Sequence, residues 1–170
     1  VFIGPCIAKK SEVKRYKDAG KVGADYVLTF DELYAMFLAK NIDPEAMASS
    51  DVQQGSKYGK NFATSGGVSA AVQEVLAEEK FDMPVSCLKC SGAAECKKAL
   101  MLLRVGKLNE TIIEGMACEG GCVNGPAKIS DVRESVGMRR QLMLSVDDRS
   151  IADNLEMSDF KEIDMKDGRN

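Results

Sequence analysis

The chain has 170 residues, of which 45% are hydrophobic and 29% are charged, and its net charge at pH 7 is −3. This is the size and composition of an ordinary globular domain that can bury its own core. The charge balance lacks the basic excess that is typical of nucleic-acid binding, and no apolar run approaches the roughly 20 residues of a membrane span. The opening stretch VFIGPCIAKK has its apolar and basic parts in the wrong order for a secretory signal, so we expect a cytoplasmic protein.

The chain contains no histidine and six cysteines. The lack of histidine removes the commonest general base and the commonest nitrogen ligand for metals. Without a secretory context, six cysteines indicate reduced thiols or metal ligands rather than a disulfide framework. The cysteines lie at positions 6, 87, 90, 96, 118 and 122.

The first segment predicts a strand followed by a surface helix. Residues 1–4 form an apolar, β-prone run, and the basic segment 9–21 is helix-prone and contains a glycine near its end. Such a segment is typical of a solvated surface. Because a strand begins at Val1 with no preceding Met, we expect the chain to be a piece of a longer protein.

A second strand and a second helix follow. The strand is predicted over residues 24–29 and the helix over residues 30–40, with apolar side chains at helical spacing. Thr29 and Glu32 predict a capping box at the start of this helix. Residues 43–63 are mostly polar and small and predict a long irregular connection, which in compact domains is usually functional or mobile.

The middle of the chain predicts a helix, a strand and a further helix. The stretch ATSGG opens the first of these helices, whose apolar stripe consists of Val68, Ala71, Val72, Val75 and Leu76. A short strand is predicted over residues 83–89, and the next helix over residues 92–104. The expected buried face of that helix consists of Cys96, Ala99, Leu100 and Leu103.

The remaining elements complete an α/β pattern. A fourth strand is predicted over residues 110–116, and two helices from about residue 131 to residue 158. This order favours a mostly parallel four-stranded sheet flanked by helices, with a helical C-terminal part. We expect one domain or lobe over residues 1–158 and a polar tail over residues 159–170.

Three cysteines follow predicted strands. Cys6 follows the first strand, and Cys118 and Cys122 follow the fourth; in α/β sheets, sites gather at the carboxyl ends of strands. Three thiolates at such an edge indicate a soft metal ion or a cluster, and this spacing alone leaves zinc and iron–sulfur both open. Gly120 and Gly121 favour a cluster, because glycines let the backbone approach closely and form an anion-accepting nest. The alternative is a glycine turn with two incidental thiols.

The other three cysteines have a packing interpretation. Cys87 and Cys90 have the spacing of half a metal site or a redox pair. However, Cys96 lies on an apolar helical stripe and Cys87 alternates with Val85 in a strand, where a cysteine acts as a small hydrophobe.

Two further features each have a structural and a functional interpretation. Lys9 and Glu12 are three residues apart, as in an ordinary exposed ion pair, but Lys9 follows Cys6 closely and could donate to an anionic ligand. The helix start at ATSGG could hold an anion and have a role beside a cofactor, or it could serve close backbone packing. It lacks the lysine of a phosphate-binding loop, so we expect no nucleotide site there.

Several stretches together resemble the C-terminal catalytic domain of the iron-only ([FeFe]) hydrogenases. GPCIAKKSE resembles the family motif M-P-C-x-x-K-x-x-E, and EGMACEGGCVNGP resembles M-A-C-x-x-G-C followed by glycines. DYVLTFDEL and FATSGGVSAAV resemble the sequences between these motifs. The similarity runs in family order from residue 1 to about residue 126.

The resemblance implies a hydrogen cluster, in which a [4Fe–4S] cubane is bridged by a cysteine to a diiron subsite with CO, cyanide and dithiolate ligands. Cys6, Cys118 and Cys122 would hold the cubane, and Cys122 would be the bridging ligand. Lys9 would donate a hydrogen bond to a cyanide, and Met116 would line the diiron subsite. Together with Cys122 they would be the catalytic residues. Glu12 would orient Lys9 or its loop.

The sequence also departs from the family. The motif T-S-C-C-P, which precedes this chain in family order, supplies the fourth cubane cysteine and the proton-relay cysteine. Gly4 stands where the family usually has a methionine, and GPAKI at residues 125–129 replaces G-G-G-Q-P. No ferredoxin-type run of cysteines is present.

The first hypothesis is therefore that the chain is part of a hydrogenase for reversible H2 oxidation and proton reduction. The isolated chain would be inactive, and it could be without the cluster. Its partners would be the missing N-terminal part of the same protein, a ferredoxin-like electron donor or acceptor, H2 and protons. The second is a hydrogenase-like iron–sulfur protein that binds a cubane without the diiron subsite, for sensing, assembly or electron transfer. The third is a zinc-binding or purely structural module.

Overall fold

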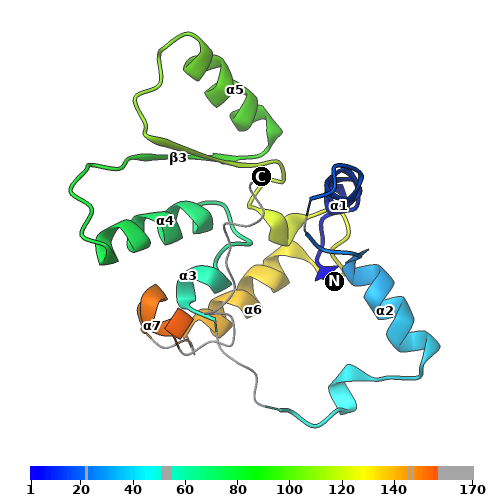
Figure 1. Cartoon of the computed structure of the whole chain (residues 1–170). Coiled ribbons are helices and arrows are strands. Elements are labelled where there is room, and N and C mark those ends of the chain that lie inside the picture. Colours follow the sequence, from blue (N-terminus) through cyan, green and yellow to red (C-terminus); the bar gives the residue numbers. More distant parts are fainter. Residues whose placement is uncertain (22, 51–54, 145, 147, 157–170) are drawn as a thin grey trace. The chain divides into compact units, whose positions relative to one another are not determined.

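The computed structural model describes residues 1–21, 23–50, 55–144, 146 and 148–156. The chain divides into two compact units, whose elements are shown in Figure 1. The described residues of the first unit lie within Val1–Val52 and Gly125–Asp131. Those of the second unit lie within Gln53–Asn124 and Val132–Lys161.

The first unit is built on a parallel β-α-β arrangement. Strand β1 (Phe2–Ile3) pairs in parallel with β2 (Val27–Leu28), and helix α1 (Ala8–Asp18) makes the crossover between them. Helix α2 (Phe30–Ala39) follows β2 directly, and a short 3-10 helix η1 (Pro44–Ala46) comes after it. The strands are short because turns begin immediately after β1 and α2 begins two residues after β2 ends.

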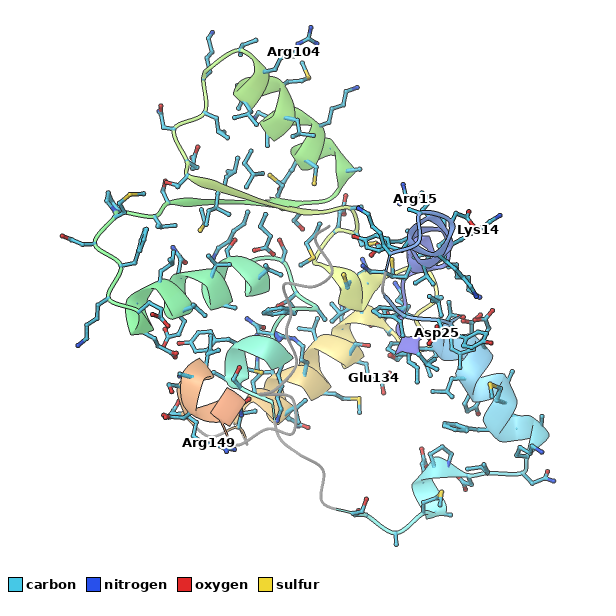
Figure 2. All side chains as sticks on the ribbon, in the orientation of Figure 1. Lys14, Arg15, Asp25, Arg104, Glu134 and Arg149 are labelled. Atoms are coloured by element: carbon cyan, nitrogen blue, oxygen red, sulfur yellow. The ribbon has the colours of Figure 1, made fainter. Side chains whose placement is uncertain are left out.

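The helices of the first unit agree with their sequence signals. The amide of Thr29 donates to Glu32 Oε2 at 2.9 Å, which confirms the predicted capping box of α2. A hydrogen bond from Lys10 and those from Thr29 lower the pKa of Glu32 to about 2. Helix α1 has no buried residue, and the exposed side chains of Lys14 and Arg15 stand out from it (Figure 2), as expected for a solvated segment.

The second unit contains a longer parallel β-α-β arrangement with helices before and after it. Strands β3 and β4 pair in parallel in a register that runs from Cys87↔Ile112 to Ser91↔Met116. In chain order the elements are α3 (Lys57–Lys60), α4 (Gly67–Glu78), β3 (Cys87–Ser91), α5 (Ala93–Arg104), β4 (Ile112–Met116), the 3-10 helix η2 (Cys122–Asn124), α6 (Val132–Leu144) and α7 (Ile151–Glu156).

Each face of the β3–β4 sheet is covered by a helix, and β3 lies between α5 and α4 in Figure 1. A Cβ on Gly115 would lie 3.3 Å from Cys96 Sγ, so this position of β4 faces α5. Glu114 and Met116 lie on the opposite face, because successive residues of a strand alternate. The buried apolar residues of this unit come from both helices and both strands, and they are Ala71, Cys90, Ala99 and Met116.

The predicted α/β class and the parallel pairing are confirmed, but the predicted four-stranded sheet is wrong. In the part of the chain that the structure describes, the strands form two separate two-stranded sheets. Hydrophobic runs indicate where strands occur and crossovers indicate that they are parallel. Neither signal indicates which strands lie side by side, so the number of sheets could not be predicted from the sequence.

The predicted buried face of α5 is also partly wrong. Ala99 is 2% exposed and Cys96 is half-buried, but Leu100 is 59% exposed and Leu103 is 53% exposed. A two-stranded sheet is about 5 Å wide between its strands and is narrower than a helix with its side chains, so it covers only part of that face.

The C-terminal part agrees with the expected pair of helices over the residues that are described. The predicted tail at residues 159–170 lies outside the described residues. No helix among the described residues has both the length and the apolar character needed to cross a membrane.

Candidate functional site

The loop that carries Cys118 and Cys122 begins directly after β4 in the second unit. Gly120 and Gly121 both have a positive φ, of 79° and 104°, so the chain reverses sharply between the two cysteines. The amide of Gly121 donates to the Cys118 carbonyl at 3.1 Å, and η2 then starts at Cys122. Residues with a side chain rarely adopt such a conformation, which explains the glycine pair locally.

Backbone packing explains Gly121 more fully. A Cβ at this position would lie 2.6 Å from the Ala63 carbonyl oxygen and 2.7 Å from the Ser65 nitrogen. Two hydrogen bonds join the same segments, from the Ser65 amide to the Gly120 carbonyl at 3.2 Å and from the Val123 amide to the Ala63 carbonyl at 3.0 Å. The cysteine loop is therefore fixed against residues 63–65 by its own backbone. A further role of the glycines beside a cluster stays a prediction.

Two sulfur atoms meet at the end of this loop. The Cys122 thiol lies 3.9 Å from Met116 Sδ, and Met116 is buried whereas Cys122 is exposed. Cys118 is half-buried. None of the six cysteines, all of which the structure describes, is in a disulfide. The loop thus carries two reduced thiols, and that of Cys122 lies next to a thioether; thiols and thioethers are soft donors.

A buried carboxylate supports the same region and was missed by the sequence analysis. Glu114 is 7% exposed, and its two oxygens accept the amides of Gly66 and Ser69, each at 2.8 Å, at the start of α4. Burial alone would raise the pKa of Glu114, but hydrogen bonds from Ser69 and Gly66, together with the charge of Lys89, outweigh it and hold the pKa below its ordinary value. The available signal was a lone acidic residue within the apolar strand sequence TIIEGM.

The structure supports the packing interpretation of the ATSGG stretch, and a role of this stretch beside a cofactor stays a prediction. The helix start holds an anion, which is the protein's own Glu114 carboxylate. Close packing is also present, since a Cβ on Gly67 would lie 2.0 Å from the Asn61 carbonyl oxygen.

The geometry of Cys87, Cys90 and Cys96 supports their packing interpretation. Cys87 and Cys90 are three residues apart in β3, so they point to opposite faces of the sheet and cannot both reach one ion. Cys90 is 2% exposed, and burial raises the pKa of its thiol. Cys96 Sγ lies 3.7 Å from the Met116 carbonyl oxygen, between α5 and β4.

The first unit brings Lys9 and Glu12 together. Lys9 Nζ lies 2.9 Å from both carboxylate oxygens of Glu12 and 5.8 Å from the centre of the Phe2 ring. These three side chains also line a pocket of about 270 Å3. Cys6 is half-buried, and its carbonyl accepts the Lys9 amide at 3.3 Å, so the first turn of α1 links the thiol segment to the lysine.

Phe2 also accounts for the glycine in the same segment. A Cβ on Gly4 would lie 3.0 Å from the Phe2 ring, so a larger side chain there would have to displace the ring. The GPAKI segment belongs to this unit as well, because the Ala127 amide donates to the Pro5 carbonyl at 3.0 Å. The segment that follows Cys122 along the chain is therefore bonded to the direct neighbour of Cys6.

The predicted site residues are divided between the units. Cys6, Lys9 and Glu12 belong to the first, and Met116, Cys118 and Cys122 belong to the second. Within either unit, the described side chains include no group of three Cys, His, Asp or Glu that could hold a metal ion. The convergence of Cys6 with the other two cysteines stays a prediction.

Comparisons with known proteins agree with the motifs. Residues 1–126 match the family described as iron only hydrogenase large subunit, C-terminal domain. No curated protein matches the chain by sequence at a significant level.

Three solved structures are similar in fold. HydA(ΔEFG), solved in work on stepwise H-cluster assembly in an [FeFe]-hydrogenase, has a TM-score of 0.61 at 19% identity over 99% of this chain and 59% of its own. A variant of HydA1 from Chlamydomonas reinhardtii has a TM-score of 0.63 at 19% identity, with the same coverage. An [FeFe]-hydrogenase studied for oxygen inactivation at its 2Fe subcluster has a TM-score of 0.64 at 18% identity, over 99% of this chain and 58% of its own. This chain thus spans about three-fifths of the length of these proteins.

Proposed function

The chain belongs to the family of the iron-only hydrogenase large subunit, C-terminal domain, and we propose that it is part of an enzyme for reversible H2 oxidation and proton reduction. The observation that carries this proposal is the loop of Cys118 and Cys122. It presents two thiols, is fixed by backbone packing through Gly121, and places Cys122 beside the Met116 thioether at 3.9 Å.

The donor set of this chain fits an iron–sulfur group. Thiolates are the usual protein ligands of such clusters, and the chain has no histidine that would compete. Cys6, Cys118 and Cys122 would hold a [4Fe–4S] cubane, with Cys122 as the ligand shared with a diiron subsite. When bound, this hydrogen cluster supplies the electron transfer and the hydrogen chemistry, and the protein supplies binding, orientation and electrostatics.

Lys9 and Glu12 would act on the ligands of the diiron subsite. The ammonium of Lys9 has three donors, and Glu12 holds it in one place at 2.9 Å. A lysine fixed in this way can direct a remaining N–H toward an anionic ligand such as cyanide. Met116, buried beside Cys122, would line the same subsite and exclude water from it.

The chain would require further parts of the same protein. It spans about three-fifths of the length of the hydrogenase structures to which it is similar. The remaining part would supply the fourth cubane ligand and the proton-relay cysteine, and a ferredoxin-like protein would exchange electrons with the cluster in the cytoplasm.

One observation favours a second function, that of a cubane-binding protein without the diiron subsite. Gly4 stands where the family usually has a methionine near that subsite, and the Phe2 ring fills the space of a side chain at 3.0 Å. Such a protein would serve in sensing, assembly or electron transfer.

The two functions predict different results for the whole protein after cofactor maturation. The hydrogenase predicts H2 evolution and infrared bands of CO and cyanide, whereas the isolated 170-residue chain evolves no H2 because it lacks a ligand and the proton relay. Lys9→Met shifts the cyanide bands, because the donor to that ligand is lost. Lys14→Met, on the exposed side of the same helix, leaves them unchanged.

Other outcomes separate the proposals. A cubane seen by electron paramagnetic resonance without CO or cyanide bands supports the second function. H2 evolution by the isolated chain contradicts the requirement for further parts.

A further inference from the structure

Glu114 lies in an unusual place for an acidic residue. It is the third residue of β4, on the same face as Met116, and it lies four positions before Cys118. A buried carboxylate is unfavourable unless hydrogen bonds replace its water, and the register partner of Glu114 on β3 is Lys89, whose charge also favours the ionised form. Because β4 leads directly into the cysteine loop, the contacts of Glu114 can affect the position of that loop.

The contacts of Glu114 tie β4 to the start of α4. The residue that precedes the first turn of α4 is Gly66, which has no side chain with which to cap the helix. The Glu114 carboxylate supplies that cap from a segment 45 to 48 residues away, through both of its oxygens. The first amides of a helix need such acceptors and attract negative charge.

A second attachment joins the same two regions. Residues 63–65 contact Gly120 and Gly121 through backbone atoms, and the Val123 amide donates to the Ala63 carbonyl. Residues 63–69 therefore contact the chain on both sides of Cys118. They bind the Glu114 side chain, which precedes Cys118 in the sequence, and the Gly120–Val123 backbone, which follows it. Cys118 lies between these two attachments, and Cys122 lies within the second.

We propose that Glu114 is a positioning residue that fixes the loop of Cys118 and Cys122 against the start of α4 and so sets the two thiols for an iron–sulfur ligand. The inference rests on the proposed function for the identity of that ligand. Its physical basis is that the loop is held by backbone contacts to residues 63–65, and that the Glu114 carboxylate holds the residues that come next, through the amides of Gly66 and Ser69.

The variant Glu114→Gln separates this role from simple packing. The amide has the shape of the carboxylate, but its NH2 group faces a backbone N–H and leaves one donor without an acceptor. Glu78→Gln is a matched control in the same unit. The Glu78 carboxylate also accepts two backbone amides at a helix start, those of Ile151 at 2.7 Å and Ala152 at 3.1 Å, but the helix is α7 and not the support of the cysteine loop.

The first measurement needs no metal. In the apo chain, the alkylation rate of Cys118 and the hydrogen exchange of residues 117–124 are compared among the wild type and the two variants. Glu114→Gln increases both rates about 5–30-fold, as expected for the loss of one or two kcal/mol of local stability. Glu78→Gln leaves both unchanged, and Cys6 alkylation is unchanged in either variant.

The second measurement is iron per chain after anaerobic reconstitution with iron and sulfide. Glu114→Gln lowers it and Glu78→Gln does not. Glu114→Asp, which keeps the charge on a shorter side chain, gives an intermediate value and replaces the glutamine variant if that one does not fold.

Equal effects of Glu114→Gln and Glu78→Gln, or no effect of either on Cys118, overturn the positioning role. A wild-type chain that takes up no iron even when a small thiol is supplied as the fourth ligand contradicts the proposed cubane-binding role of its cysteines instead. The alkylation and exchange rates then still decide whether Glu114 positions the loop.

Discussion

At the scale of single residues, the two glycines of the cysteine loop have different roles. Gly121 is buried against the backbone of residues 63–65, and a Cβ there would collide with atoms that cannot move independently. Gly120 also has a positive φ, but among the described residues no atom beyond its two chain neighbours lies within 4 Å of where its Cβ would be. Only Gly121 is required for docking of the loop.

Alanine substitutions test this difference. Gly120→Ala is expected to cost about 1–2 kcal/mol in the free energy of unfolding of the second unit, from backbone conformation alone. Gly121→Ala adds a clash with backbone atoms and is expected to cost about 2–5 kcal/mol in total. Urea unfolding of both variants measures the two values. Equal destabilisation by the two substitutions would show that the loop does not dock through Gly121.

The residue scale also shows what sequence reasoning could find. The loop of Cys118 and Cys122 could be singled out as a candidate site because its thiols and glycines are close together in the chain. Glu114 was missed because its partners, Gly66 and Ser69, are 45 or more residues away and are backbone amides. Every residue type except proline has a backbone amide, so the sequence does not show which amides will bind a carboxylate. The only sequence signal was the ATSGG stretch, which marks a helix start with unpaired amides.

At the scale of elements, helix α4 depends on an acidic residue of β4 for its first turn. Hydrogen bonds from Ser69 and Gly66 keep the pKa of Glu114 below its ordinary value despite its burial. A carboxyl whose pKa is lower in the folded than in the unfolded state stabilises the fold above its unfolded pKa. This contribution is lost as the pH falls through the folded value.

The pH dependence of this helix start is therefore predictable. As the pH falls from neutrality, the amide NMR signals of Gly66 and Ser69 are expected to titrate with a midpoint below 4.5, the ordinary pKa of the carboxyl. The stability of the second unit falls over the same range. Glu114→Gln removes this part of the pH dependence, and Glu78→Gln retains it. A midpoint at or above 4.5 would contradict the assignment.

The elements were predictable to different degrees. The capping box of Thr29 and Glu32 and the apolar spacing that follows it located α2, because capping and periodicity are local signals. The exposure of Leu100 and Leu103 was not predictable from the helical stripe of α5, since it depends on the width of the sheet below the helix.

At the scale of the whole molecule, the chain consists of two parallel β-α-β arrangements, each in its own compact unit. The sequence predicted four strands and their parallel direction but not their division into two sheets, because the pairing of strands is a long-range property. The family motifs lie after the carboxyl ends of strands: Cys6 follows β1, and Cys118 follows β4. The two arrangements therefore carry different ligands of the proposed cluster.

The most direct test of this account is the iron content of the 170-residue chain after anaerobic reconstitution with iron, sulfide and a small thiol that can serve as the fourth ligand. We expect about four iron atoms per chain, with the electron paramagnetic resonance of a reduced [4Fe–4S] cluster. Cys6→Ala, Cys118→Ala and Cys122→Ala each abolish it, whereas Cys87→Ala retains it because that side chain packs in β3. Stoichiometric zinc without iron, or iron binding that survives the loss of Cys6, Cys118 or Cys122, would contradict the account.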